Sequence, residues 1–198
     1  MRGKNILSSL PGICFTTSDI MALVKLYQSK NVSSFSPDTA LVFILTNFAG
    51  FIFANKPNNI YTYLGFMLPA LIDTLIICLY YYKLDQWSSI YIFLLGITIW
   101  TTMFFWYVFT FPNTVSKYSN SVGMISGIIN PLGVFLQLIK IYKTNACHGV
   151  SIVSWRLQLI GNIGLYFLTG KLTNIFNITQ SFLTAFLNLL IILKCATG

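Results

Sequence analysis

Residues 136–144 read Leu-Gln-Leu-Ile-Lys-Ile-Tyr-Lys-Thr, and residues 21–29 read Met-Ala-Leu-Val-Lys-Leu-Tyr-Gln-Ser. The two stretches share a leucine, a lysine and a tyrosine at matching places, and they lie 115 residues apart (Leu23 with Leu138). The same offset aligns both halves of the chain without a gap. Further identical pairs are Gly12 and Gly127, Ile13 and Ile128, Ser36 and Ser151, Asn47 and Asn162, Lys56 and Lys171, and Asn59 and Asn174. A general apolar bias explains some matches of Leu and Ile, but it does not align Lys, Tyr, Ser and Asn, so the offset predicts an internal duplication.

The composition indicates a membrane protein. Of the 198 residues, 56% are hydrophobic, 16% are aromatic and only 8% are charged. A soluble domain carries about a quarter charged residues, so this chain has too few to cover a water-exposed surface. Its formal charge of +8 is compatible with nucleic-acid binding. The basic residues, however, stand singly at the ends of apolar runs, as membrane-spanning helices require, and no nucleic-acid partner is expected.

Seven apolar runs approach the ~20 residues that one helical span needs. They cover residues 7–27, 39–54, 60–82, 88–109, 121–142, 151–169 and 173–194. Short polar breaks separate them, among them residues 55–59, 112–120 and 170–171. Because a backbone in lipid must satisfy its own hydrogen bonds, each run is expected to form an α-helix.

The duplication explains the number of spans. Three helices cross the membrane an odd number of times, so a second copy keeps the same orientation only if one extra span is inserted. The sequence therefore predicts an all-α, multi-pass membrane protein in a 3+1+3 arrangement. A three-helix repeat covers residues 7–83, a linker helix covers 88–109, and a second, parallel repeat covers 121–194. Seven basic residues on the side of the C-terminus against five on the other favour a cytoplasmic C-terminus.

The cysteines and the histidine predict no cofactor. Cys14, Cys78, Cys147 and Cys195 show no C-x-x-C spacing, and His148 is the single histidine. Neither a disulfide nor a metal site is expected from this pattern. An enzyme embedded in the membrane would need a constellation such as a Ser/His pair or paired acids. None is found, so the chain is not expected to be an enzyme.

The stretch 136–144, with Ser151 opening the next run, resembles the PQ-loop motif of the SWEET/PQ-loop superfamily, and Gln137 stands at the glutamine of that motif. The second repeat is similar to the three-helix SemiSWEET subunits, and the whole chain resembles their fused seven-helix SWEET relatives. Further residues that carry this resemblance are Gly161, Asn162, Tyr166, Gly170, Thr184 and Asn188.

This resemblance implies a transmembrane carrier that works by alternating access, and it favours a sugar-type solute. It makes Pro131 a candidate hinge and Gln137 a candidate gating residue. It also places Gln180 and Ser181 near a position where the family has an asparagine in its substrate site.

Polar side chains inside the apolar runs mark further candidate substrate-binding residues, because such groups are costly in lipid. Asn47 and Asn162 are repeat mates near the middle of their runs, and either interhelical hydrogen bonding or solute contact accounts for them. Asp73 lies midway along its run, and its repeat mate is Asn188. A carboxylate at a helix centre costs about 3 kcal/mol, so Asp73 is expected to face a wet cavity and to bind a cation or carry a proton. Asp19, the mate of Val134, fits a structural role equally well.

Two alternatives to a facilitative sugar carrier stay open at this point. One is a proton-coupled transporter of amino acids or other small metabolites, and the other is a non-transporting membrane receptor of the same fold. The expected partners are a small polar solute and membrane lipid. A proton as a further partner and a homo-oligomer of the chain are both possible from the sequence, which does not decide either. Pro69, one turn before Asp73, is expected to kink the third helix.

Overall fold

The computed structural model describes residues 2–54, 63–168 and 175–197, and within these ranges it contains helices and no strand. The helices are α1 (Arg2–Gln28), α2 (Pro37–Ala54), the short π-helix η1 (Tyr63–Met67), α4 (Leu68–Lys83), α5 (Trp87–Thr110), α6 (Pro112–Thr144), α7 (Ile152–Leu168) and α8 (Ile175–Thr197). The helical class predicted from the apolar runs is therefore confirmed. The predicted breaks at residues 55–59 and 170–171 lie outside the described residues.

Two local predictions about proline need correction. Residues 112–120 were expected to form a polar break, but they form the first turns of α6. Proline has no N–H to lose in a first turn and its φ suits a helix, so Pro112 starts α6 rather than ending a span. Pro69 was expected to kink the third helix. It lies instead in the first turn of α4, and the irregular segment is the π-helix η1 that immediately precedes α4.

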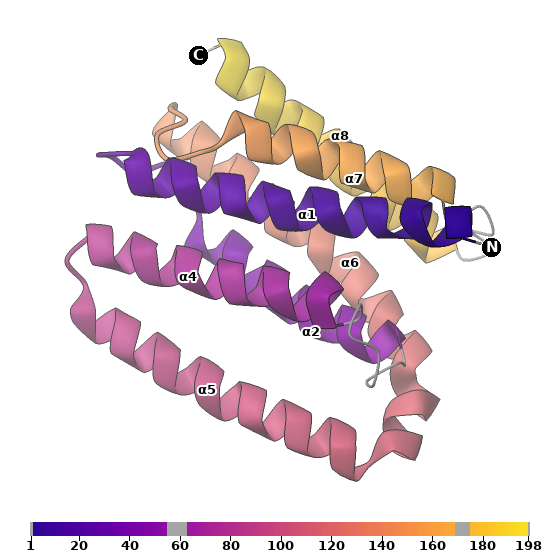
Figure 1. Ribbon diagram of the computed structural model, residues 1–198. Helices are drawn as coiled ribbons and strands as arrows, with labels where there is room; N and C mark the ends of the chain where they lie inside the picture. The colour runs from indigo at the N-terminus through magenta and orange to yellow at the C-terminus, as the bar shows by residue number, and fades with distance from the viewer. Residues whose placement is uncertain (1, 55–62, 169–174, 198) are drawn as a thin grey trace.

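Six helices form a closed ring. α1 packs against α4 and α7, α2 packs against α4 and α6, and α8 packs against α6 and α7. We call α1, α2 and α4, with the short η1 that precedes α4, the first unit, and α6, α7 and α8 the second unit. When each helix is exchanged for its counterpart at the 115-residue offset, every contact of the ring becomes another contact of the ring. Figure 1 shows each helix of the second unit running in the same direction as its counterpart.

The helix α5 lies along the outer edge of the bundle (Figure 1), where it packs against α4 and α6. Phe48 of α2 contacts Trp100 and Phe104 of α5, with ring centroids 4.3 and 4.7 Å apart. Most other α5 side chains are exposed, and only Ile90 and Val108 are buried. This placement is that of a helix that belongs to neither unit.

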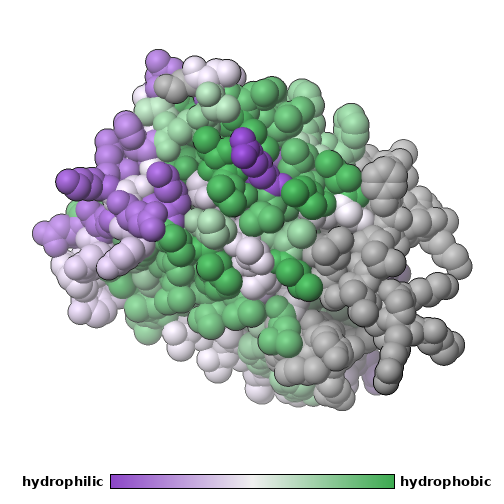
Figure 2. Space-filling view, turned by 45° about the horizontal axis from the view of Figure 1, so that its top comes forward, coloured by the Kyte–Doolittle hydropathy of each residue, from purple (hydrophilic) through white to green (hydrophobic). Residues whose placement is uncertain are grey.

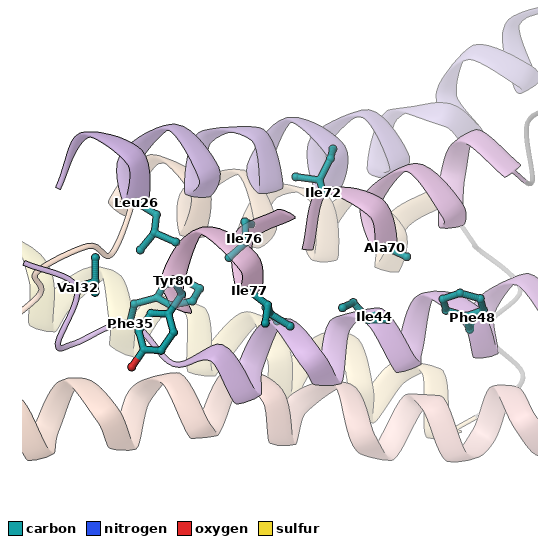
Figure 3. Close-up of a cluster of buried hydrophobic side chains, with 11 residues drawn as sticks. Leu26, Val32, Phe35, Ile44, Phe48, Ala70, Ile72, Ile76, Ile77 and Tyr80 are labelled. Atoms are coloured by element: carbon teal, nitrogen blue, oxygen red, sulfur yellow. The ribbon is translucent and has the colours of Figure 1, made fainter. Parts of the chain in front are cut away.

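Each unit has its own hydrophobic core. The core of the first unit joins α1, α2 and α4, and Figure 3 shows Val32, Phe35 and Tyr80 gathered at one end of it. The core of the second unit joins α6, α7 and α8 around residues such as Val134 and Ile191, both fully buried.

The outer surface suits a membrane. Within the described residues, five helices are long and apolar enough to span one: Pro37–Ala54, Leu64–Lys83, Trp87–Thr110, Pro112–Thr144 and Gln180–Thr197. Figure 2 shows a broad apolar face with hydrophilic side chains gathered at one end of the molecule. Large apolar side chains such as Ile92 and Phe182, exposed by 72% and 73%, would be unfavourable in water.

A disulfide joins Cys147, in the loop between α6 and α7, to Cys195 near the end of α8, and the Cα atoms lie 5.7 Å apart. The expectation of no disulfide was therefore wrong. The two cysteines are 48 residues apart, so only the packing of α8 against the rest of the second unit brings them together. Cys14 and Cys78 are free.

Candidate functional site

A cavity of about 310 Å³ lies between the two units, a volume typical of small-molecule sites. All six helices of the ring and η1 contribute to its wall. The lining residues are Phe15, Asp19, Phe43, Thr46, Asn47, Gly50, Phe53, Gly65, Phe66, Pro69, Asp73, Gly123, Ser126, Asn130, Gln158, Asn162, Gln180, Ser181 and Thr184.

The lining positions are related by the duplication, but their chemistry is not. Six pairs of lining residues stand 115 positions apart: Phe15 and Asn130, Phe43 and Gln158, Asn47 and Asn162, Gly65 and Gln180, Phe66 and Ser181, and Pro69 and Thr184. In five of these pairs the first unit supplies an apolar residue or glycine where the second unit supplies an amide or hydroxyl group. The cavity therefore has an aromatic wall from the first unit and a hydrogen-bonding wall from the second.

The aromatic wall also carries two carboxyl groups. Asp19 of α1 and Asp73 of α4 are 6% and 2% exposed, and both line the cavity. Among the described lining residues there is no Lys, Arg or His to balance them. Asp73 Oδ2 has no hydrogen-bond partner in the described part of the chain.

On the opposite wall, α8 presents a row of buried polar groups. Thr184 lines the cavity, and its Oγ1 has no hydrogen-bond partner among the described residues. Asn188, one turn further along, is fully buried, and both its Oδ1 and its Nδ2 lack a partner there too. Groups of this kind are rare in the interior of a protein, so they mark α8 as part of the candidate site.

Five of the six predicted substrate-binding residues come together at this cavity. Asn47, Asn162, Asp73, Gln180 and Ser181 all line it, whereas Asn188 is not among the lining residues. Asn162 is buried, and its Nδ2 donates to the carbonyl of Gln158 in its own helix (2.8 Å). These five residues therefore share one site, although their contact with a solute stays a prediction.

Several lining residues were not singled out from the sequence. Thr46, Ser126, Asn130 and Gln158 add polar groups to the cavity. The repeat offers a signal for two of them, because Asn130 and Gln158 have phenylalanines as mates, and a polar residue opposite an aromatic mate marks a position where the two units differ. Asp19, for which a structural role was equally acceptable, lines the cavity beside Asp73.

The cavity is closed toward the end of the bundle that carries the C-terminus. A second cavity of about 30 Å³ follows there, and it too is lined by Asp19 and Asp73. Gln137, which is 1% exposed, also lines this second cavity and bridges the units. Its Nε2 donates to the carbonyl of Ser34 (2.7 Å), and its Oε1 accepts from the backbone N–H of Ser36 (2.9 Å). Thr144 of α6 also donates to Ser34 Oγ (2.9 Å).

Gln137 thus fastens the loop between α1 and α2 to α6, a placement suited to the gating role implied by the resemblance. Pro131 lies buried inside α6, two residues before Gly133. Its role as a hinge stays a prediction.

Two further hydrogen-bonded contacts join the units at repeat-related positions. Thr39 of α2 donates to the carbonyl of Gly133 in α6 (2.8 Å). At the mates of these residues, Ser18 of α1 donates to the carbonyl of Ser154 in α7 (3.0 Å), and the two hydroxyl oxygens lie 2.9 Å apart. The contact between α2 and α6 and the contact between α1 and α7 therefore use corresponding positions of the two units.

Compared with known proteins, the chain matches no family model, no curated protein and no solved structure.

Proposed function

We propose that this protein is a transmembrane carrier that moves a small polar solute by alternating access, with the two three-helix units rocking about the central cavity. The observation that carries this proposal is the cavity itself, which lies between two units that contact each other at repeat-related positions. A site enclosed by two equivalent bodies can be exposed to either end when the bodies tilt.

The state of the two ends supports the proposal. The cavity extends from Asp73 toward Phe53 near the end of α2, whereas Gln137 and Thr144 hold the opposite end shut. These contacts are few and polar, so they can break and re-form at modest cost. The resemblance to the SWEET/PQ-loop superfamily supports the same function, and on its own it favours a sugar-type solute. The excess of basic residues at the shut end favours that end as the cytoplasmic one.

A second candidate is a carrier coupled to protons. It is favoured by Asp19 and Asp73, whose carboxyl groups line the cavity without a basic neighbour among the described lining residues. A carboxylate in such a place can be neutralised by a proton, and a proton that leaves at the other side of the membrane would couple transport to a gradient.

The test is a reversible lock between the units. Ser18→Cys and Ser154→Cys, in a background with Cys14→Ser and Cys78→Ser, place two thiols where the hydroxyl oxygens are 2.9 Å apart. The purified chain is reconstituted in proteoliposomes, and uptake of radiolabelled glucose, alanine, uridine and choline is measured. We expect oxidation to stop uptake and reduction to restore it. The native Cys147–Cys195 bond lies within one unit, so the same background without the two new cysteines is the control and should keep its uptake when oxidised.

Uptake that persists in the cross-linked protein would contradict rocking between the units. A probe that binds, as seen by thermal stabilisation, but is never taken up would favour the receptor. Uptake of an uncharged probe driven by an imposed pH gradient would favour the proton-coupled candidate.

A further inference from the structure

We propose that the solute is an organic cation, a small amine or quaternary ammonium compound, bound with its positive charge against Asp19 and Asp73. This inference rests on the proposed function and names the class of solute for the same cavity. It is carried by the unequal chemistry of the two walls.

The charge of the cavity is the first step. Asp19 and Asp73 enter it from neighbouring helices, both more than nine-tenths buried, and no cationic side chain is among the described residues that line it. A buried anion without a partner is costly, and a bound cation removes that cost. A sugar has no charge and would leave the carboxyl groups unbalanced. Asp73 Oδ2, which has no partner among the described residues, is an acceptor available to an ammonium N–H.

The aromatic residues are the second step. Phe15, Phe43, Phe53 and Phe66 line the same cavity as the two acids. The face of an aromatic ring attracts an ammonium group, and this attraction is strongest away from water. A wall of phenylalanines with carboxyl groups is therefore suited to an alkyl- or arylammonium group, which has both a charge and an apolar body.

The size and donor set argue against a metal ion as the occupant. A volume of about 310 Å³ is that of a molecular ligand rather than a single ion. In the described part of the chain no group of three or more His, Cys, Asp or Glu residues lies together. Ca²⁺ and Mg²⁺ are bound by cages of about six or more oxygen ligands. Two carboxyl groups on an aromatic wall suit an organic cation better than either metal ion.

The opposite wall adds a requirement for a second polar group on the solute. Asn130, Gln158 and Ser181 of the second unit offer amide and hydroxyl groups in the same cavity as the phenylalanines, and the buried Oγ1 of Thr184 has no partner among the described residues. A solute that carries a hydroxyl, carbonyl or amide group as well as its ammonium group can satisfy both walls at once. Because the walls differ, such a solute has one preferred orientation.

The test compares each cation with a neutral molecule of the same shape. The purified full chain is titrated with choline and with 3,3-dimethylbutan-1-ol, which replaces the nitrogen by carbon, and with benzylamine and benzyl alcohol. Glucose is included as the sugar probe. Binding is followed by thermal stabilisation, and uptake into proteoliposomes is followed separately. Asp19→Asn and Asp73→Asn remove one charge each, and Asp38→Asn removes an exposed carboxylate outside the lining as the matched control.

We expect at least one cation to stabilise the protein while its neutral partner does not. Its affinity should fall about tenfold in each of the two cavity variants and stay unchanged in the Asp38 variant, because each cavity variant removes one of the two negative charges that attract the cation. Equal binding of the neutral partners, binding of glucose alone, binding of no probe, or unchanged cation affinity in both cavity variants would overturn the inference. Glucose uptake without cation binding would leave the carrier standing, whereas cation binding without uptake would remove the carrier and leave the cation site.

Discussion

The two three-helix units share one pattern of contacts and differ in what they present to the cavity. The first unit supplies phenylalanines and two carboxyl groups, and the second supplies amides and hydroxyls at the repeat-related positions. Asp73 has Asn188 as its mate, and Asp19 has the buried Val134. The two units have therefore kept the pattern of helix contacts while most of the paired positions that face the cavity differ. A cavity with two identical walls would bind a solute equally well in two orientations, whereas two different walls favour one orientation of the solute.

The same contrast is present at the end that carries the C-terminus. The second unit is joined there by the Cys147–Cys195 disulfide, and the mates of these cysteines are Val32 and Tyr80. Both of those residues belong to the hydrophobic core of the first unit, with the Phe35 and Tyr80 rings 5.8 Å apart (Figure 3). One unit thus holds its loop by a covalent bond and the other holds it by packing.

The largest effect on stability is expected when an aspartate is introduced into the second unit at the position that corresponds to Asp19. Val134→Asp places a carboxylate at the mate of Asp19, but Val134 is fully buried in the core of the second unit. We expect a loss of about 3–5 kcal/mol of stability, because the new charge has no partner. Thermal unfolding of the purified protein measures it.

Asp19→Val is the reverse exchange and the control for the first prediction. It removes a buried charge, so the unfolding temperature should stay the same or rise. If the two exchanges destabilise the protein equally, the contrast between the units does not lie in these residues.

The next effect concerns the disulfide. Cys147→Ser with Cys195→Ser should lower stability by about 2–4 kcal/mol, since the bond closes a long loop in the unfolded chain. Cys78→Ser, at a free cysteine, is the control. Adding a reductant should reproduce the loss in the native protein and have no effect on the double variant; an equal response of both would contradict the bond.

A smaller effect is expected at Gln137, the candidate gating residue. Gln137→Ala removes two hydrogen bonds to the loop of the first unit and leaves buried backbone groups unpaired, at a cost of about 1–3 kcal/mol. The loop should then open more often, so a cysteine introduced at the buried Ser34 should react faster with a water-soluble maleimide. Gln86→Ala, at an exposed glutamine near the same end, should change neither quantity.

The smallest effect is a dependence of cation binding on pH. Protonation of Asp19 or Asp73 removes the charge that attracts the cation, so affinity should fall by about tenfold once these groups are protonated as the pH is lowered. Among the described lining residues of α1, α2, η1 and α4, these are the acidic groups, and none is basic. Isothermal titration with choline at several pH values measures the effect. A pH dependence that survives Asp19→Asn with Asp73→Asn would assign it to another group.

Much of the fold was predictable because it depends on patterns that one sequence contains. Apolar length predicts helices, and the offset that pairs Asn47 with Asn162 predicts which helices correspond. The cavity was predictable in part, since a polar residue such as Asp73 in an apolar run needs a polar surrounding. Proximity between distant residues was not predictable, and the disulfide was missed for that reason. Asn188, chosen as the repeat mate of Asp73, is not among the residues that line the cavity. The position of Pro112 was predicted wrongly because proline occurs both just after the end of a helix and in the first turn of the next one, and the sequence alone does not distinguish the two.

The disulfide also bears on the orientation of the chain in its membrane. Disulfides persist in oxidising compartments and are reduced in the cytosol, whereas the count of basic residues assigns this same end of the bundle to the cytosol. The oxidation state of Cys147 and Cys195 therefore reports sidedness: differential alkylation of the protein in its native membrane, read by mass, distinguishes a bonded pair from two thiols. A bonded pair would place the C-terminus on the side away from the cytosol and reverse the orientation favoured by charge.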